Sequence, residues 1–155
     1  MKKYTLLFLL IFSVSAFSQE AYLELLRSDL KANKVAVITA AMDFSDEEAD
    51  VFWPVYREYE LELSKLGDQR VALIKDYAQN FDTMTDAKAK ELVEKSFDLK
   101  KKQNDLLKKY FKKLDKVMPT TRAALFAQIE NQIQMMVDLQ IASELPLFEK
   151  AVTSK

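Results

Sequence analysis

Residues 85–117 read TDAKAKELVEKSFDLKKKQNDLLKKYFKKLDKV, a stretch without glycine or proline. Apolar side chains return every three or four residues along it, from Leu92 through Tyr110. Steps of this size place the apolar side chains on one face of an α-helix. The stretch therefore predicts a long helix that ends near Val117, with one apolar seam and with Thr85 as its N-cap.

The preceding stretch predicts a second long helix that ends near Asn80. Ser45-Asp46-Glu47-Glu48 has the pattern of a capping box, in which the Ser45 hydroxyl accepts from the Glu48 N–H and the Glu48 carboxylate accepts from the Ser45 N–H. From Phe52 onward, apolar residues follow in heptad steps. Pro54 interrupts the backbone hydrogen bonding here, so we expect it either to kink this helix or to divide it.

Two heptad-patterned helices joined by a few residues predict an antiparallel hairpin. With its turn centred near residue 83, the numbers of facing residues sum to about 166, which places Glu58 near Lys108. Residues 43–62 carry eight acids against one Arg, whereas residues 86–117 carry eleven lysines against six acids. The hairpin therefore explains the uneven charge, because it brings the acidic stretch beside the Lys-rich end of the helix over 85–117, the third of the chain.

Two further helices flank the hairpin. Residues 20–42 and residues 121–143 each carry a helical apolar stripe, and Pro146 ends the second of them. The predicted fold is all-α with four helices, a long antiparallel helical hairpin with flanking N- and C-terminal helices. Residues 19–148 are expected to form a single helical domain, followed by a frayed tail over 149–155.

The first 18 residues have the pattern of an export signal. Two lysines precede a nearly continuous apolar run over 4–14, which is too short to span a bilayer as a helix. Ala16-Phe17-Ser18 places small residues where a signal peptidase needs them, so we expect cleavage before Gln19. A second cleavage site after Ala16 and a retained amphipathic anchor are the alternatives. We therefore predict a signal peptide over 1–18 and a periplasmic protein.

The composition argues against common enzyme chemistry. The 155 residues include no Cys, no His and one Gly, which excludes thiol and imidazole nucleophiles, thiolate or imidazole metal ligands, and a Gly-rich phosphate loop. The acidic cluster over 43–50 lacks the pattern of a calcium-binding loop, and the 24 acids form no specific catalytic pair. A net charge of −1 gives no nucleic-acid signal. We predict no enzyme, no cofactor and no bound metal.

Two groups of side chains are candidates for binding another protein. The first group consists of lysines of the third helix, whose alternative role is a solvated face paired with the acidic stretch: Lys101, Lys108, Lys109, Lys112 and Lys113. The second group consists of large apolar residues that either pack in the core or remain exposed unless another chain covers them: Trp53, Phe111, Met135 and Met136.

A third group consists of polar residues within the otherwise apolar seam of the hairpin: Arg70, Ser96 and Gln103. Polar residues at such positions control the register of paired helices or mark a partly open groove. The functional interpretation is a polar-lined surface that holds a client protein or a partner subunit.

Two short boxes repeat one pattern at the starts of the two long helices. Phe44-Ser45-Asp46-Glu47-Glu48 and Met84-Thr85-Asp86-Ala87-Lys88 both read apolar–hydroxyl–x–x–polar. They resemble the LTxxQ box of the Spy/CpxP family of periplasmic helical proteins. Phe44 and Met84 stand where that box has Leu, and Glu48 and Lys88 stand where it has Gln. Over about 35–148, the order of the motifs is most similar to uncharacterised exported bacterial proteins with this layout.

The resemblance implies an all-helical antiparallel dimer shaped like a shallow cradle. It also implies an ATP-independent chaperone or an envelope-stress role, with unfolded proteins held on a concave apolar and basic face. The chain is therefore expected to bind unfolded or partly folded proteins. The rival hypothesis is a dedicated interaction module for one envelope protein, such as an inhibitory partner of an envelope stress sensor.

Overall fold

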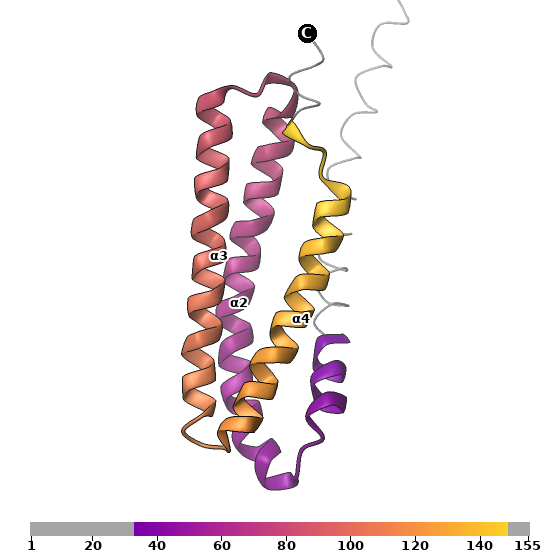
Figure 1. Ribbon diagram of the computed structural model, residues 1–155, viewed down its shortest axis with the longest axis vertical. Coiled ribbons are helices and arrows are strands. Elements are labelled where there is room, and N and C mark those ends of the chain that lie inside the picture. Colours follow the sequence, from indigo (N-terminus) through magenta and orange to yellow (C-terminus); the bar gives the residue numbers. More distant parts are fainter. Residues whose placement is uncertain (1–32, 149–155) are drawn as a thin grey trace, which may run out of the picture. The chain divides into compact units, whose positions relative to one another are not determined.

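The computed structural model describes residues 33–148, and every regular element in this range is helical (Figure 1). A helix over 33–42 comes first. It is followed by α2 (Asp46–Asn80), the short 3₁₀ helix η1 (Phe81–Thr83), α3 (Asp86–Leu114) and α4 (Thr120–Glu144). The prediction of an all-α protein with four helices is confirmed.

Some of the predictions fall outside the described residues. These are the signal peptide over 1–18, the part of the first helix before residue 33, and the tail over 149–155. Of the described residues, those from Met42 onward form one compact unit, which holds α2, α3 and α4.

The capping box fixes the beginning of α2. The Ser45 hydroxyl accepts from the Glu48 N–H at 3.2 Å, and the Glu48 carboxylate accepts from the Ser45 N–H at 3.2 Å. Pro54 lies inside the helix, which continues through it to Asn80. Of the two expected outcomes, division of the helix at Pro54 does not occur.

α2 and α3 run side by side in opposite directions (Figure 1). The Thr85 hydroxyl accepts from the Lys88 N–H at 3.2 Å, so Thr85 caps α3 as expected. α3 ends at Leu114, three residues before the predicted end. There the Val117 N–H donates to the Leu114 carbonyl at 2.9 Å, which tightens the chain into a turn before Pro119. Pro119 has no N–H to donate to the carbonyl four residues earlier, at Asp115, and its ring crowds that carbonyl, which accounts for the earlier end of the helix.

Ion pairs between the two helices define the register of the hairpin. Lys113 pairs with Glu58 at 2.6 Å and Lys109 pairs with Glu62 at 2.7 Å, so the partners' numbers sum to 171. The prediction that Glu58 lies near Lys108 is therefore wrong. Each side chain leans towards the N-terminus of its own helix, so partners in an antiparallel pair meet with their backbones offset along the axis. The acidic stretch does lie beside the Lys-rich end of α3, as expected.

An aromatic core joins the N-terminal half of α4 to the hairpin. Phe126 is fully buried, and its ring centroid lies 5.5 Å from that of Phe52, 6.2 Å from Tyr56 and 5.6 Å from Tyr59. The Tyr59 ring lies in turn 5.4 Å from Tyr110 of α3. Most of these rings meet edge to face, the arrangement that the charge distribution of aromatic rings favours. The three helices thus share one core at this end of the hairpin.

Arg122 fixes the beginning of α4 against the beginning of α2. Its Nε and Nη2 donate to the two carboxylate oxygens of Glu48 at 2.7 and 2.8 Å, and Nη2 also donates to the Met42 carbonyl at 2.5 Å. The hydrogen bond from Arg122, followed by that from the Ser45 N–H, lowers the pKa of Glu48 below its ordinary value. Glu48 therefore serves both the cap of α2 and the docking of α4.

One carboxylate lies inside the aromatic core. Glu130 of α4 is fully buried and accepts from the Tyr59 hydroxyl at 3.0 Å. Burial, and then the charge of Glu130, raises the pKa of Tyr59 well above its ordinary value. The phenol therefore remains protonated and able to donate.

Candidate functional site

The candidate lysines of α3 fall into two groups. Lys101, Lys109 and Lys113 are each held in an ion pair with a carboxylate. Among residues 33–148, no ion pair involves Lys108 or Lys112. The paired carboxylates offset the charge of the first group. Of the five candidate lysines, Lys108 and Lys112 therefore have the positive charge that a partner can reach most easily.

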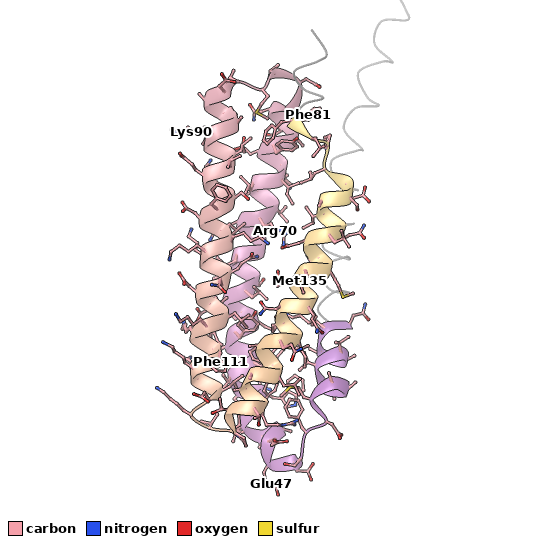
Figure 2. The ribbon with its side chains drawn as sticks, viewed as in Figure 1. Glu47, Arg70, Phe81, Lys90, Phe111 and Met135 are labelled. Carbon is pink, nitrogen blue, oxygen red and sulfur yellow. The ribbon has the colours of Figure 1, made fainter. Side chains whose placement is uncertain are left out.

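Phe111 and Met135 lie on one surface between α3 and α4 (Figure 2). Both line a shallow hollow whose remaining lining consists of small and amide side chains: Ala124, Ala127, Gln128, Asn131 and Gln132. Lys108 lies next to both Phe111 and Lys112 on the surface of α3, because they follow it by three and four residues. We call Lys108, Phe111, Lys112 and Met135 the α3–α4 face. It combines apolar contact area with two unpaired positive charges.

Trp53 belongs to the aromatic core. Its side chain is half-buried, and its ring centroid lies 5.7 Å from Phe44, 5.2 Å from Phe52 and 5.6 Å from Tyr56. The structure thus gives Trp53 a packing role at the start of α2. Met136, which was grouped with it as a candidate, is 71 % exposed and does not line the hollow.

The two boxes at the helix starts both act as caps. In the first, Phe44 packs on Phe52 with ring centroids 4.6 Å apart, beside the Ser45–Glu48 capping box. In the second, the Lys88 ammonium donates to Asp76 of α2 at 2.8 Å, which connects the two sides of the hairpin turn. This hydrogen bond lowers the pKa of Asp76. Met84, the first residue of the second box, is half-buried in the turn itself.

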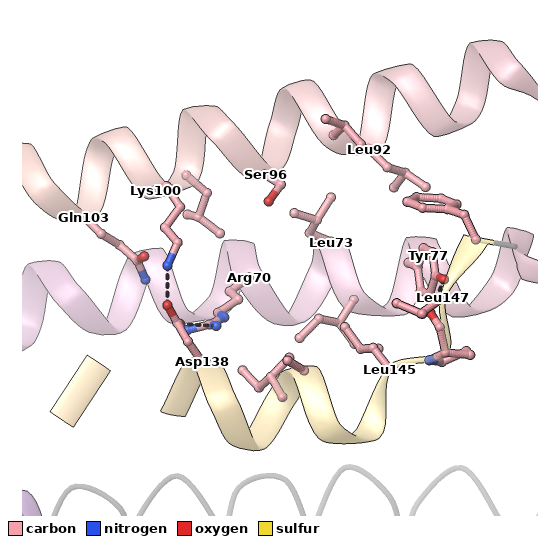
Figure 3. A pocket seen from close by; sticks show the side chains of 17 residues that line it. Arg70, Leu73, Tyr77, Leu92, Ser96, Lys100, Gln103, Asp138, Leu145 and Leu147 are labelled. Atoms are coloured by element: carbon pink, nitrogen blue, oxygen red, sulfur yellow. Dashed lines mark hydrogen bonds and ion pairs between the residues drawn. The ribbon is translucent and has the colours of Figure 1, made fainter. Parts of the chain in front are cut away.

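A second, more enclosed depression lies between α2, α3 and α4 towards the turn of the hairpin (Figure 3). We call it the three-helix groove, and its volume is about 390 Å³. Its lining is mostly apolar and comes from all three helices and the chain after α4: Leu73, Ile74, Leu92, Val93, Leu99, Ile141, Leu145, Leu147 and Phe148. Arg70, Ser96 and Gln103 also line it. The partly open groove expected as one role of these seam residues is therefore present.

Three charged side chains meet beside the groove. Asp138 of α4 accepts from the Arg70 guanidinium of α2 at 2.5 Å and also pairs with the Lys100 ammonium of α3 (Figure 3). Burial raises the pKa of Asp138, but the hydrogen bonds from Lys100 and Arg70 outweigh it, so the net shift is downward. The cluster therefore holds two cations and one carboxylate and has a surplus of one positive charge.

The chain after α4 closes the opposite end of the groove. The Tyr77 hydroxyl of α2 donates to the Pro146 carbonyl at 2.5 Å, and the Tyr77 ring lies 5.2 Å from that of Phe148. Burial raises the pKa of Tyr77 above its ordinary value. The groove therefore has a charged end and an aromatic end.

Some exposed apolar residues were not singled out from the sequence. Phe97 of α3 is 69 % exposed and Leu139 of α4 is 72 % exposed. The signal for Phe97 was its place at the edge of the heptad seam, four residues after Val93. For Leu139, the signal was that α4 carries apolar residues on more than one side.

Comparison with models of known protein families, with curated proteins and with solved structures finds no match for this chain. Within the described part of the chain, no helix is both long and apolar enough to cross a membrane. Over the same residues, no group of three or more Asp or Glu side chains is close enough together to hold a metal ion. The structural features that bear on function are thus the α3–α4 face and the three-helix groove.

Proposed function

We propose that the protein is an exported, ATP-independent chaperone or envelope-stress protein that binds unfolded clients on the α3–α4 face. The observation that carries this proposal is the combination of Phe111 and Met135 in one hollow with Lys108 and Lys112 beside it. The resemblance of the two helix-start boxes to the Spy/CpxP family supports the same function. The proposal assigns no catalytic step to the chain.

Capture on this face is expected to begin with charge and to continue with apolar contact. Unpaired lysines attract acidic segments of an unfolded chain over roughly a Debye length, about 8–10 Å at physiological salt. Phe111 and Met135 then cover apolar side chains of the client. Because the hollow is shallow, the contact area per client segment is small and binding is expected to be weak and reversible.

Light scattering from a chemically unfolded, aggregating client tests the proposal directly. The purified protein is added without nucleotide, at low and at moderate salt. We expect suppression of scattering near equimolar ratio, weaker at the higher salt. A folded sample that does not suppress scattering at several-fold excess would remove the chaperone function.

A charge-reversal pair tests the role of the α3–α4 face. Lys108→Glu/Lys112→Glu should capture clients several-fold less well than the parent. Lys65→Glu/Lys90→Glu introduces the same change in net charge on exposed positions outside the face, and it should capture clients nearly as well as the parent. Equal losses in both pairs would mean that net charge matters and the face does not.

A second candidate function is a dedicated module for one envelope protein, such as the inhibitory partner of a stress sensor. The observation that favours it is that the α3–α4 face is built on two helices and not on loops, because rigid elements suit one defined interface. A pull-down at defined stoichiometry distinguishes the two functions. One dominant partner favours the dedicated module, and many unrelated partners favour the chaperone.

The resemblance also implies a homodimer, which we include in the proposal. Met136 and Leu139 of α4, 71 % and 72 % exposed, are the apolar positions that a second copy would cover. Sedimentation equilibrium of the parent and of Met136→Ser/Leu139→Ser tests this. The parent should sediment as a dimer and the variant should dissociate at higher concentration, whereas a monomeric parent would remove the dimer from the proposal.

A further inference from the structure

The three-helix groove is separate from the α3–α4 face and has a different chemistry. No residue lines both the groove and the hollow that holds Phe111 and Met135. The groove is mostly apolar along its length and charged at one end, where Arg70 and Lys100 meet Asp138. An apolar depression with a few convergent polar groups is the usual form of a small-molecule site.

The net positive charge of the Arg70–Lys100–Asp138 cluster favours a ligand with an anionic group at this end of the groove. Among residues 33–148, Asp138 is the only one with a carboxylate that lines the groove, and it faces two cations. Arg70 donates to Asp138 through Nη2 alone at 2.5 Å, although a guanidinium carries five N–H groups. The carboxylate of a ligand can therefore bind to the surplus positive charge and to the remaining N–H groups of Arg70. The planar guanidinium matches the geometry of a carboxylate.

The lining favours a hydrocarbon chain over a peptide. The three helices that line most of the groove have their backbone groups bonded within each helix, so an extended peptide would find few backbone partners along them. A helical peptide satisfies its own backbone but needs a cylinder about 10 Å wide. The polar groups of the groove converge at one end, around Arg70, Lys100 and Asp138, which suits a single acidic head group with an apolar tail better than the polar groups spaced along a peptide helix.

The length of the groove determines how long a hydrocarbon chain it can hold. Lys100 and Leu92 both line it and are eight residues apart on α3, which corresponds to about 12 Å. An extended chain advances roughly 3.5 Å for every three bonds. About ten bonds therefore reach from the charged end to the aromatic end at Tyr77 and Phe148.

We propose that the three-helix groove binds a fatty acid of about ten to twelve carbons, with its carboxylate at Arg70 and Lys100 and its tail directed towards Tyr77. This inference does not rest on the chaperone function, because it uses a different surface. Ser96 lies midway along the groove, where its small side chain leaves room for the tail (Figure 3).

Isothermal titration of the purified protein with dodecanoate, below its micellar concentration, tests the proposal. We expect one dodecanoate per chain, with at least tenfold weaker binding of hexanoate because half the tail contacts are missing. Dodecan-1-ol and dodecyltrimethylammonium have the same tail without the carboxylate and should also bind at least tenfold more weakly. Several dodecanoates per chain, or equal binding of the three head groups, would overturn the proposal.

Two pairs of variants locate the site. Arg70→Gln should weaken dodecanoate binding about tenfold or more, whereas Arg57→Gln, on an exposed part of α2, should leave it unchanged. Ser96→Leu places a larger side chain in the groove and should abolish binding, whereas Ser64→Leu makes the same change at a position of α2 that does not line the groove and should leave binding unchanged. Circular dichroism confirms that each variant remains helical. Undiminished binding by folded Ser96→Leu would show that the ligand lies elsewhere and would overturn the proposal.

Discussion

Replacement of Phe126 tests whether the aromatic core holds α4 on the hairpin. Phe126→Ala removes a side chain with no exposed surface and three ring contacts, to Phe52, Tyr56 and Tyr59. A buried Phe→Ala change costs about 3–5 kcal/mol of unfolding free energy. Each aromatic pair contributes about 0.5–1.5 kcal/mol beyond burial, so we expect the loss to fall in the upper half of that range.

The matched control is Phe97→Ala on α3. Its side chain is 69 % exposed, so the same chemical change should cost less than about 1 kcal/mol. For a domain of this size, 1 kcal/mol corresponds to roughly 3–5 °C in Tm. Phe126→Ala should therefore melt about 12–25 °C below the parent, whereas Phe97→Ala should stay within about 5 °C.

Urea and thermal unfolding followed by circular dichroism measure both variants. Phe126→Leu, which keeps the site apolar, provides a milder replacement if the alanine variant does not fold, and it should lie between the parent and Phe126→Ala. If Phe126→Ala lost no more stability than Phe97→Ala, Phe126 would not be in the core. The docking of α4 described above would then be wrong.

Three further changes test the helix starts and the hairpin ion pairs. Ser45→Ala removes the capping box and should cost about 1 kcal/mol, whereas Ser64→Ala in the interior of α2 should cost nothing in the same urea titration. Pro54→Ala restores a helical hydrogen bond and should raise stability by about 2 kcal/mol, so a lower Tm would contradict the description of α2 as one continuous helix. Hydrogen bonds from Lys109 and then Tyr110 lower the pKa of Glu62, so its stabilising effect is present above the unfolded-state pKa near 4.5 and is lost as the pH falls through the lower folded-state value. The stability gap between the parent and Glu62→Gln should therefore close as the pH falls below the unfolded-state value near 4.5, and a gap that stayed constant, or one equally large for Glu94→Gln, would refute this account.

Features set by neighbouring residues were predictable from the sequence. The Ser45 and Thr85 caps and the end of α2 at Asn80 were all expected, because each depends on residues within one helical turn. The all-helical class followed from heptad steps and from the near absence of glycine. The polar positions of the seam, Arg70 and Ser96 among them, predicted either control of the register, a partly open groove or a polar-lined binding surface, and both residues line the three-helix groove.

Features set by residues far apart in the chain were not predictable. Nothing local to Glu48 or Arg122 shows that they pair across 74 positions, because each has a complete local explanation as a cap residue or a solvated cation. The offset of the ion-pair partners along the helix axis was missed for a related reason. It depends on the direction in which side chains lean, which the spacing of Glu58 and Lys113 along the chain does not contain.

α4 carries more apolar surface than its contact with the hairpin buries. A helix packed on one neighbour needs a stripe about 100° wide, and the buried residues Ala123, Phe126 and Ile129 supply it. Further along, Met135 and Leu139 are 62 % and 72 % exposed and contribute nothing to that contact. Exposed apolar groups of this kind mark surfaces that another molecule covers. Met135→Ser should therefore leave the urea midpoint unchanged while it weakens client capture, and Leu61→Ser, which exchanges another exposed apolar residue on α2, should change neither. A variant at Met135 that lost stability instead would show that this side chain supports the fold, and the α3–α4 face would lose its main apolar contact.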